Sequence, residues 1–175
     1  MAISVDVGQM LVNLSQSHDA VFKMLTGGAY VLGFAFAVLA IFSLKHLSES
    51  RTMMSGQQSL GPPLMYFLVA AVFLYMPSAI DSLMMTTFGA TASPIGYSET
   101  SGDVVSADVT RAIYLMVQMV GLVAFIKGWL ILAQSAKGGG SQQLGKALTH
   151  ILGGILAINI IGTKNVIWAS FGLSG

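Results

Sequence analysis

The three histidines are the side chains in this sequence best suited to chemistry, and they are far apart. His18, His46 and His150 stand in separate stretches, and no carboxylate pair lies within a long apolar run. A zinc enzyme needs a pattern such as HExxH, and a non-haem iron site needs two histidines and a carboxylate. Neither pattern is present. The sequence therefore predicts a protein that is not an enzyme, with no catalytic residues, no metal site and no cofactor.

The stretch GGGSQQLGKA, residues 138–147, resembles the start of a phosphate-binding loop. That motif, GxxxxGK[ST], requires Ser or Thr directly after the lysine and a buried strand before the glycines. Here Ala147 follows Lys146, and a long apolar run stands on each side of the stretch. The sequence therefore argues against a nucleotide site at this position.

Two polar residues interrupt the apolar runs. Lys127 lies six residues from the end of its run, roughly 9 Å at 1.5 Å per residue, which a lysine stem can bridge to place its ammonium among head groups. The alternative is a cation at a subunit interface, bound to a lipid phosphate or a partner's carboxylate. Asn159 lies in the middle of its run, where we expect it to hydrogen-bond to a neighbouring helix.

The composition requires lipid around much of the chain. Of its 175 residues, 54% are hydrophobic and 9% charged, with a mean hydropathy of +0.76, whereas soluble domains carry about 25% charged residues. A net charge of +1 without clustered Lys or Arg gives no support for sequence-specific nucleic-acid binding. The absence of cysteine excludes disulfides and thiolate metal sites.

Four apolar runs predict an all-α membrane protein with about four transmembrane helices in two hairpins. The runs are 24–44, 64–80, 112–133 and 147–163, and the first has 21 residues, close to the ~20 that cross a bilayer. Pro77 is expected to bend or end the second helix. The single membrane domain divides into an N-terminal amphipathic segment 1–23, a first hairpin 24–80, an acidic Ser/Thr/Gly-rich extracytoplasmic loop 81–111, and a second hairpin with a tail, 112–175.

The cations are distributed unequally between the two sides. Four fall in the turns after the first and third runs, namely Lys45, Arg51, Lys137 and Lys146, against Lys23, Arg111 and Lys164 on the other side. Because cytoplasmic loops are enriched in Lys and Arg, the turns near residues 55 and 140 are predicted to be cytoplasmic. Both termini and residue 95 are then extracytoplasmic.

Two similar polar phrases, SGQQSLGPPL at 55–64 and GGGSQQLGKAL at 138–148, occupy the two turns. Aligning Gly121 with Gly33 superposes the apolar runs, and aligning Gln142–Gln143 with Gln57–Gln58 superposes the phrases. This favours a duplication with both hairpins in the same orientation, a known membrane architecture. Chance similarity is the alternative, because Gly and Gln are common in such turns.

Small residues four positions apart allow helix backbones to approach closely. We expect close packing, within one chain or between copies, at three such pairs: Gly33 and Ala37, Ala124 and Gly128, and Gly153 and Ala157. Contacts with lipid or a partner are expected at four polar residues: Lys127, Lys137, Lys146 and Asn159.

The stretches SGQQSLGPPLMYFLVAAVFLYMPSAIDSL (55–83) and GGGSQQLGKALTHILGGILAINIIGT (138–163) resemble one family. They are similar to the small inner-membrane proteins of type IVB (Dot/Icm-type) secretion systems and I-type conjugation systems, such as DotE (IcmC), DotP (IcmD) and TraQ. The resemblance implies a multi-pass protein of the bacterial inner membrane. It also implies a structural subunit that assembles with other subunits of an apparatus moving DNA or protein between cells.

Two other functions stay open from the residues alone. Each half has the outline of a conjugative pilin, with an apolar helix, a short basic turn and a second apolar helix, which favours a filament or channel-wall subunit. A small membrane transporter is the other alternative, for which Asn159 is the candidate polar residue near the bilayer centre.

Overall fold

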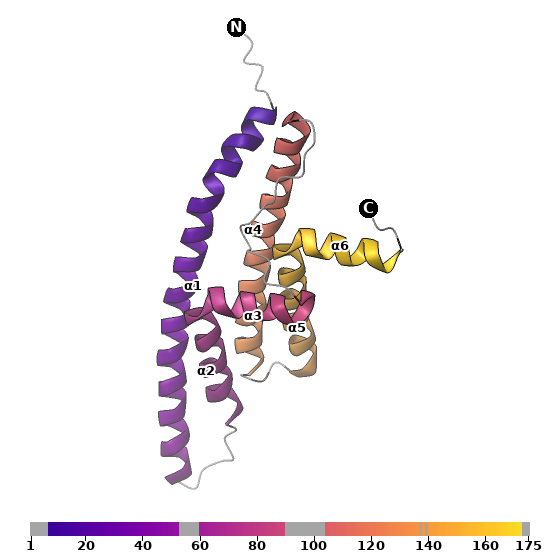
Figure 1. Cartoon of the computed structure of the whole chain (residues 1–175). Helices are drawn as coiled ribbons and strands as arrows, with labels where there is room; N and C mark the ends of the chain where they lie inside the picture. The colour runs from indigo at the N-terminus through magenta and orange to yellow at the C-terminus, as the bar shows by residue number, and fades with distance from the viewer. Residues whose placement is uncertain (1–6, 53–59, 90–103, 137, 139, 173–175) are drawn as a thin grey trace.

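The computed structural model describes the chain except for residues 1–6, 53–59, 90–103, 137, 139 and 173–175. Every regular element in the described residues is a helix, as Figure 1 shows. The six helices are α1 (Val7–Thr52), α2 (Gly61–Leu74), α3 (Met76–Phe88), α4 (Val104–Ser135), α5 (Gly140–Ile158) and α6 (Ile160–Ser170). The predicted all-α architecture is confirmed.

The candidate membrane spans are of two kinds. Ala20–Glu49 in α1 and Thr110–Ser135 in α4 are each long and apolar enough to cross a bilayer. The pairs α2 with α3 and α5 with α6 are also apolar enough, but they bend by 95° and 94°. The described residues thus contain two straight candidate spans, or four if each bent pair is one span, and the chain is a multi-pass membrane protein.

Two predicted boundaries differ from the structure, and a third segment joins its neighbour. The N-terminal segment 1–23 was expected to run into the first span, and α1 is continuous from Val7 to Thr52. The predicted loop 81–111 is shorter, because α3 extends to Phe88 and α4 begins at Val104. The fourth apolar run is not one straight helix, because it breaks at Asn159 between α5 and α6.

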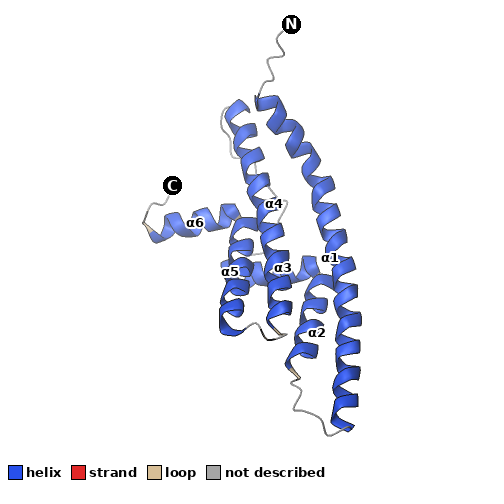
Figure 2. Ribbon diagram, turned by 180° about the vertical axis from the view of Figure 1, so that it is seen from behind, coloured by secondary structure: helices blue, strands red, loops and turns tan. Residues whose placement is uncertain are grey.

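The chain consists of two units with the same order of helices. Unit one (α1, α2 and α3) and unit two (α4, α5 and α6) each have a long helix, a shorter antiparallel helix and a crosswise helix. The long helices run in the same direction, and α3 and α6 point the same way in both views (Figures 1 and 2). The two hairpins therefore have the parallel orientation that the duplicated phrases predicted.

The sequence alignment of the two phrases also matches the bends. An offset of 84 residues, which aligns Leu144–Gly145 with Leu60–Gly61, places Asn159 on Tyr75. These are the two residues at which the bent helices break, and their backbone angles are similar (φ −115°, ψ 33° for Tyr75; φ −107°, ψ 59° for Asn159). The correspondence of breaks argues against chance similarity of the two phrases.

The core lies between the two hairpins and beneath α3. The two largest fully buried side chains are Phe73 of α2 and Phe125 of α4, and Phe36 of α1 packs near Phe73 with ring centres 6.1 Å apart. From α3, Met76, Ile80 and Met84 join the same cluster at a spacing of four residues, which places all three on one helical face. The crosswise helix α3 thus packs on the rest of the molecule through one apolar stripe.

Candidate helix-packing site

In unit one, the long and short helices approach each other closely at Gly33. A Cβ atom at this glycine would lie 3.0 Å from Phe73 Cβ and 3.0 Å from the backbone nitrogen of Leu74. Gly33 is buried, and a larger side chain would push α2 away from α1. The glycine therefore sets the separation of the two helices just below the bend at Tyr75.

Unit two repeats this contact with closely corresponding atoms. A Cβ atom at Gly121 would lie 2.8 Å from Ala157 Cβ and 2.8 Å from the backbone nitrogen of Ile158. With the offset of 84, Ala157 and Ile158 are the counterparts of Phe73 and Leu74. The contact in unit two is tighter, because Gly154 opposes Gly121, and a Cβ at Gly154 would lie 2.7 Å from the backbone nitrogen of Phe125.

A second close contact lies one heptad further along α4. A Cβ atom at Gly128 would lie 2.8 Å from the backbone nitrogen of Ile151 and 3.1 Å from the carbonyl oxygen of Ala147. Its counterpart in unit one, at an offset of 88 residues, is Ala40, which is fully buried. Both units therefore have a small residue at this level of the long helix.

Of the predicted packing residues, Gly153 is in the wrong place for a contact within the chain. It is exposed, and no atom lies within 4 Å of a Cβ built on it. The close contact is made by its neighbour Gly154, one residue or about 100° further round the helix. Ala37, Ala124 and Ala157 are half-buried.

Two hydrogen bonds donated by residues of α6 hold the bend in unit two. Asn159 is buried, and its side-chain Oδ1 accepts a hydrogen bond of 3.0 Å from the backbone N–H of Gly162, which caps α6. The hydroxyl of Thr163 donates to the carbonyl of Leu156 in α5, at 2.7 Å. Asn159 was expected to bond to a neighbouring helix across the bundle, and instead it caps the helix that follows it.

The bend in unit one has no such side-chain cap. Pro77 lies in the first turn of α3, where its missing N–H leaves no donor unpaired. Had the helix continued from α2, the same proline would have removed a hydrogen bond and clashed with the preceding turn. The predicted effect of Pro77 is confirmed, since α2 ends at Leu74 and the chain turns by 95°.

The predicted cationic contacts that the structure describes are at the surface. Lys127 and Lys146 are both exposed, and Lys137 lies outside the described residues. Lys146 also provides a backbone carbonyl that bonds with Nδ1 of His150 at 2.9 Å. Neither Lys127 nor Lys146 brings a cation into the packed contacts between α1 and α2 or between α4 and α5.

The sequence analysis missed Gly121 and Gly154 as contact residues. Both could have been found, because Gly121 was already aligned with Gly33, and Gly154 lies three residues before Ala157. Tyr75 was missed as the break in the second span, because an exposed tyrosine at a helix junction has no distinctive sequence signal.

The arrangement positions helices and does not gather reacting groups. Among the described residues, no group of three or more His, Asp and Glu side chains lies close enough together to hold a metal ion. Several hydroxyls bond to carbonyls of their own helix, such as Thr26 to Phe22 and Thr149 to Gly145, which satisfies them without a partner helix. No family model, curated protein or solved structure matches the chain.

Proposed function

We propose that the protein is a non-enzymatic structural subunit of a bacterial type IVB secretion or conjugation apparatus. It packs with copies or partner subunits in the inner membrane and forms or supports the translocation channel. The class of apparatus is inferred from the resemblance of the stretches 55–83 and 138–163 to small proteins of such systems.

One observation carries the structural role. In unit one the crosswise helix α3 buries Met76, Ile80 and Met84, whereas no residue of the equivalent helix α6 is buried. With Val166, Ile167 and Trp168 exposed, and Phe171 exposed just after its last residue, α6 has an apolar surface that the other described residues leave uncovered. A subunit that completes its packing in an assembly accounts for this difference between the units.

The broken helices give a specific reason to consider a transporter, since many carriers bind their substrate where spanning helices are interrupted. In such carriers the polar groups at the break are available to the substrate. Here the side chain of Asn159 accepts the hydrogen bond from Gly162, and Tyr75 is exposed on the surface. We therefore favour the structural subunit over a carrier.

The proposal is tested by deleting the gene and measuring transfer of DNA or protein to recipient cells. We expect transfer to be abolished, restored by the wild-type chain and by variants with Ala at His18, His46 or His150. Gly154→Leu is expected not to restore it, because it disrupts the contact between α4 and α5. Normal transfer in the deletion strain, together with saturable solute uptake by the purified protein in liposomes, would favour the carrier instead.

A further inference from the structure

The two units are arranged head to tail and are not related by a two-fold axis. A two-fold axis along the membrane normal would make α3 and α6 point in opposite directions, but they point the same way in both views (Figures 1 and 2). The contacts agree: α2 packs on α4 and α3 reaches α5, while in the described residues the reverse pairs, α1 with α5 and α2 with α6, make no comparable contact. Unit two therefore follows unit one head to tail.

In a head-to-tail arrangement of two units, one face of each unit has no neighbouring unit to pack against. Equivalent positions that are buried in one unit and exposed in the other mark the faces on which the surroundings of the two units differ. Coverage by the neighbouring unit accounts for the difference where the contacts within the two units correspond. These positions can be identified by comparing the exposed fractions of equivalent side chains, with the offset of 88 for the long helices and 84 for the others.

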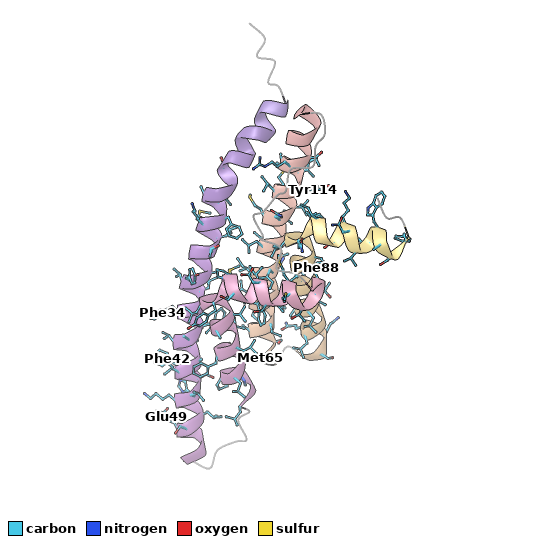
Figure 3. All side chains as sticks on the ribbon, viewed as in Figure 1. Phe34, Phe42, Glu49, Met65, Phe88 and Tyr114 are labelled. Atoms are coloured by element: carbon cyan, nitrogen blue, oxygen red, sulfur yellow. The ribbon has the colours of Figure 1, made fainter. Side chains whose placement is uncertain are left out.

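Three such positions define the outer face of unit one, which consists of Phe34, Phe67 and Leu74. Their side chains are 68%, 41% and 38% exposed. Their counterparts in unit two, Leu122, Ile151 and Ile158, are 0%, 6% and 2% exposed. Part of the burial of Ile151 comes from its own unit, because its Cγ1 would lie 2.6 Å from a Cβ at Gly128. Figure 3 shows Phe34 and Phe42 on the side of α1 that faces away from the other helices. Unit one thus carries an apolar face whose counterpart in unit two is buried.

Three other positions define the outer face of unit two, which consists of Gly153, Ile160 and Trp168. Their counterparts in unit one, Val69, Met76 and Met84, are all buried. In unit two, Gly153 is exposed and Ile160 half-buried, and Trp168 is 49% exposed where Met84 is 0% exposed. The helix α6 extends from α5 away from unit one (Figure 1), where a following unit would lie.

We infer that the outer face of unit two binds the outer face of unit one of a second copy of this chain, with α6 lying across α2 of that copy. The contact would continue the one already present inside the chain between α3 and α5. Because the two faces differ, the contact is heterologous and generates a ring or an open filament. The inference specifies the partner in the proposed assembly and rests on that proposed function only for its biological setting.

One residue of α6 differs in kind from its counterpart in α3. Lys164 stands where unit one has the buried Ile80. A lysine stem can lie on an apolar surface while its ammonium reaches the edge, and the Lys164 ammonium lies 6.0 Å from the centre of the Trp168 ring. Trp168 is then the large apolar side chain that would anchor α6 on the second copy, as tryptophan commonly does at interfaces.

The chain contains no cysteine, so introduced cysteines report directly on this contact. One tagged copy carries Trp168→Cys, and a second copy with a different tag carries Phe67→Cys, Ala71→Cys or Leu74→Cys along α2. After oxidation in native membranes, we expect a disulfide-linked dimer of the two tags for at least one α2 position. A single chain with both cysteines should give a ladder of dimers, trimers and higher multiples.

The matched control is Leu68→Cys, next to Phe67 on α2. Leu68 and its counterpart Leu152 are both exposed, so neither unit is covered there and no dimer with Trp168→Cys is expected. Trp168→Ala should also reduce the size of the native complex while the monomer stays folded. Absence of a mixed dimer at all three α2 positions, or dimers only between two copies of Trp168→Cys, would overturn the inference.

The two proposals can fail separately. If the ladder forms but deletion leaves transfer unchanged, the self-contact stands and the assignment to a transfer apparatus is wrong. If transfer is lost but no mixed dimer forms, the structural role stands and other molecules, such as lipid or a different subunit, cover α6.

Discussion

The two units bend by nearly the same angle, 95° and 94°, but different residues produce the bend. In unit one Pro77 lies in the first turn of the new helix, which has no side-chain cap. In unit two Asn159 caps the new helix, and Thr163 donates across the junction to Leu156. What the units share is the glycine on the long helix that opposes the last turn before the bend. The comparison indicates that packing fixes where the chain turns, and that the local residues only need to permit the turn.

The largest expected effect comes from filling the glycine contact of unit two. Gly154→Leu places a side chain where a Cβ alone would lie 2.7 Å from the Phe125 backbone. Because backbone cannot move aside cheaply, we expect a loss of about 3 kcal/mol or more and little folded protein in size-exclusion chromatography in detergent. Gly153→Leu, at an exposed position one residue earlier, is the matched control and should leave a folded monomer. Equal effects of the two variants would mean that α5 is rotated from its described position.

The second-largest expected effect is a difference in the free energy of unfolding between variants of the two crosswise helices. Met84 of α3 is fully buried, whereas its counterpart Trp168 of α6 is half exposed. We expect Met84→Ala to lower the free energy of unfolding by about 2–3 kcal/mol through the cavity it leaves. Trp168→Ala should change it by less than about 0.5 kcal/mol. Both are measured by thermal unfolding of the monomer in detergent, and a large loss for Trp168→Ala would show that α6 already packs within its own chain.

The smallest effect concerns the residues at the two bends. Asn159→Ala removes the acceptor that caps α6 and should cost about 1 kcal/mol, while Asn159→Ser, which keeps an oxygen acceptor, should recover most of it. Tyr75→Ala at the equivalent junction removes no cap and should cost less than about 0.5 kcal/mol. Equal losses at the two junctions, in the same unfolding assay, would contradict the assignment of Asn159 as a cap.

Much of the architecture could be predicted from the sequence, because charges are excluded from apolar spans. The gaps between charged residues located four apolar runs, and Pro77 located one bend. The second bend was missed because Asn159 permits a helix to continue as well as to end, and only its hydrogen bond to Gly162 shows which occurs.

The sequence did not show which side of each helix faces its partner, and this limited the prediction of the packing site. Gly33 and Gly128 lie at close contacts, but Gly153 faces outward, because small residues alone do not indicate which of two adjacent glycines faces the partner. The alignment of the two halves contained more information than the spacing of small residues. It places Gly121 on Gly33 and so predicts a close contact of unit two from the contact in unit one.

The lengths of the short helices have a consequence for the surrounding bilayer. The 14 residues of α2 rise only about 21 Å, against ~30 Å for an average hydrocarbon core. At that depth α3 turns crosswise with Ser78, Asp81 and Ser82 exposed, and a carboxylate in hydrocarbon is expensive. If α2 and α3 form one span, we expect the lipid beside unit one to become thinner, so that head groups and water reach α3. The 19 residues of α5 rise about 28 Å, close to the full hydrocarbon thickness, so we expect a smaller deformation beside unit two and a step in membrane thickness between the two units.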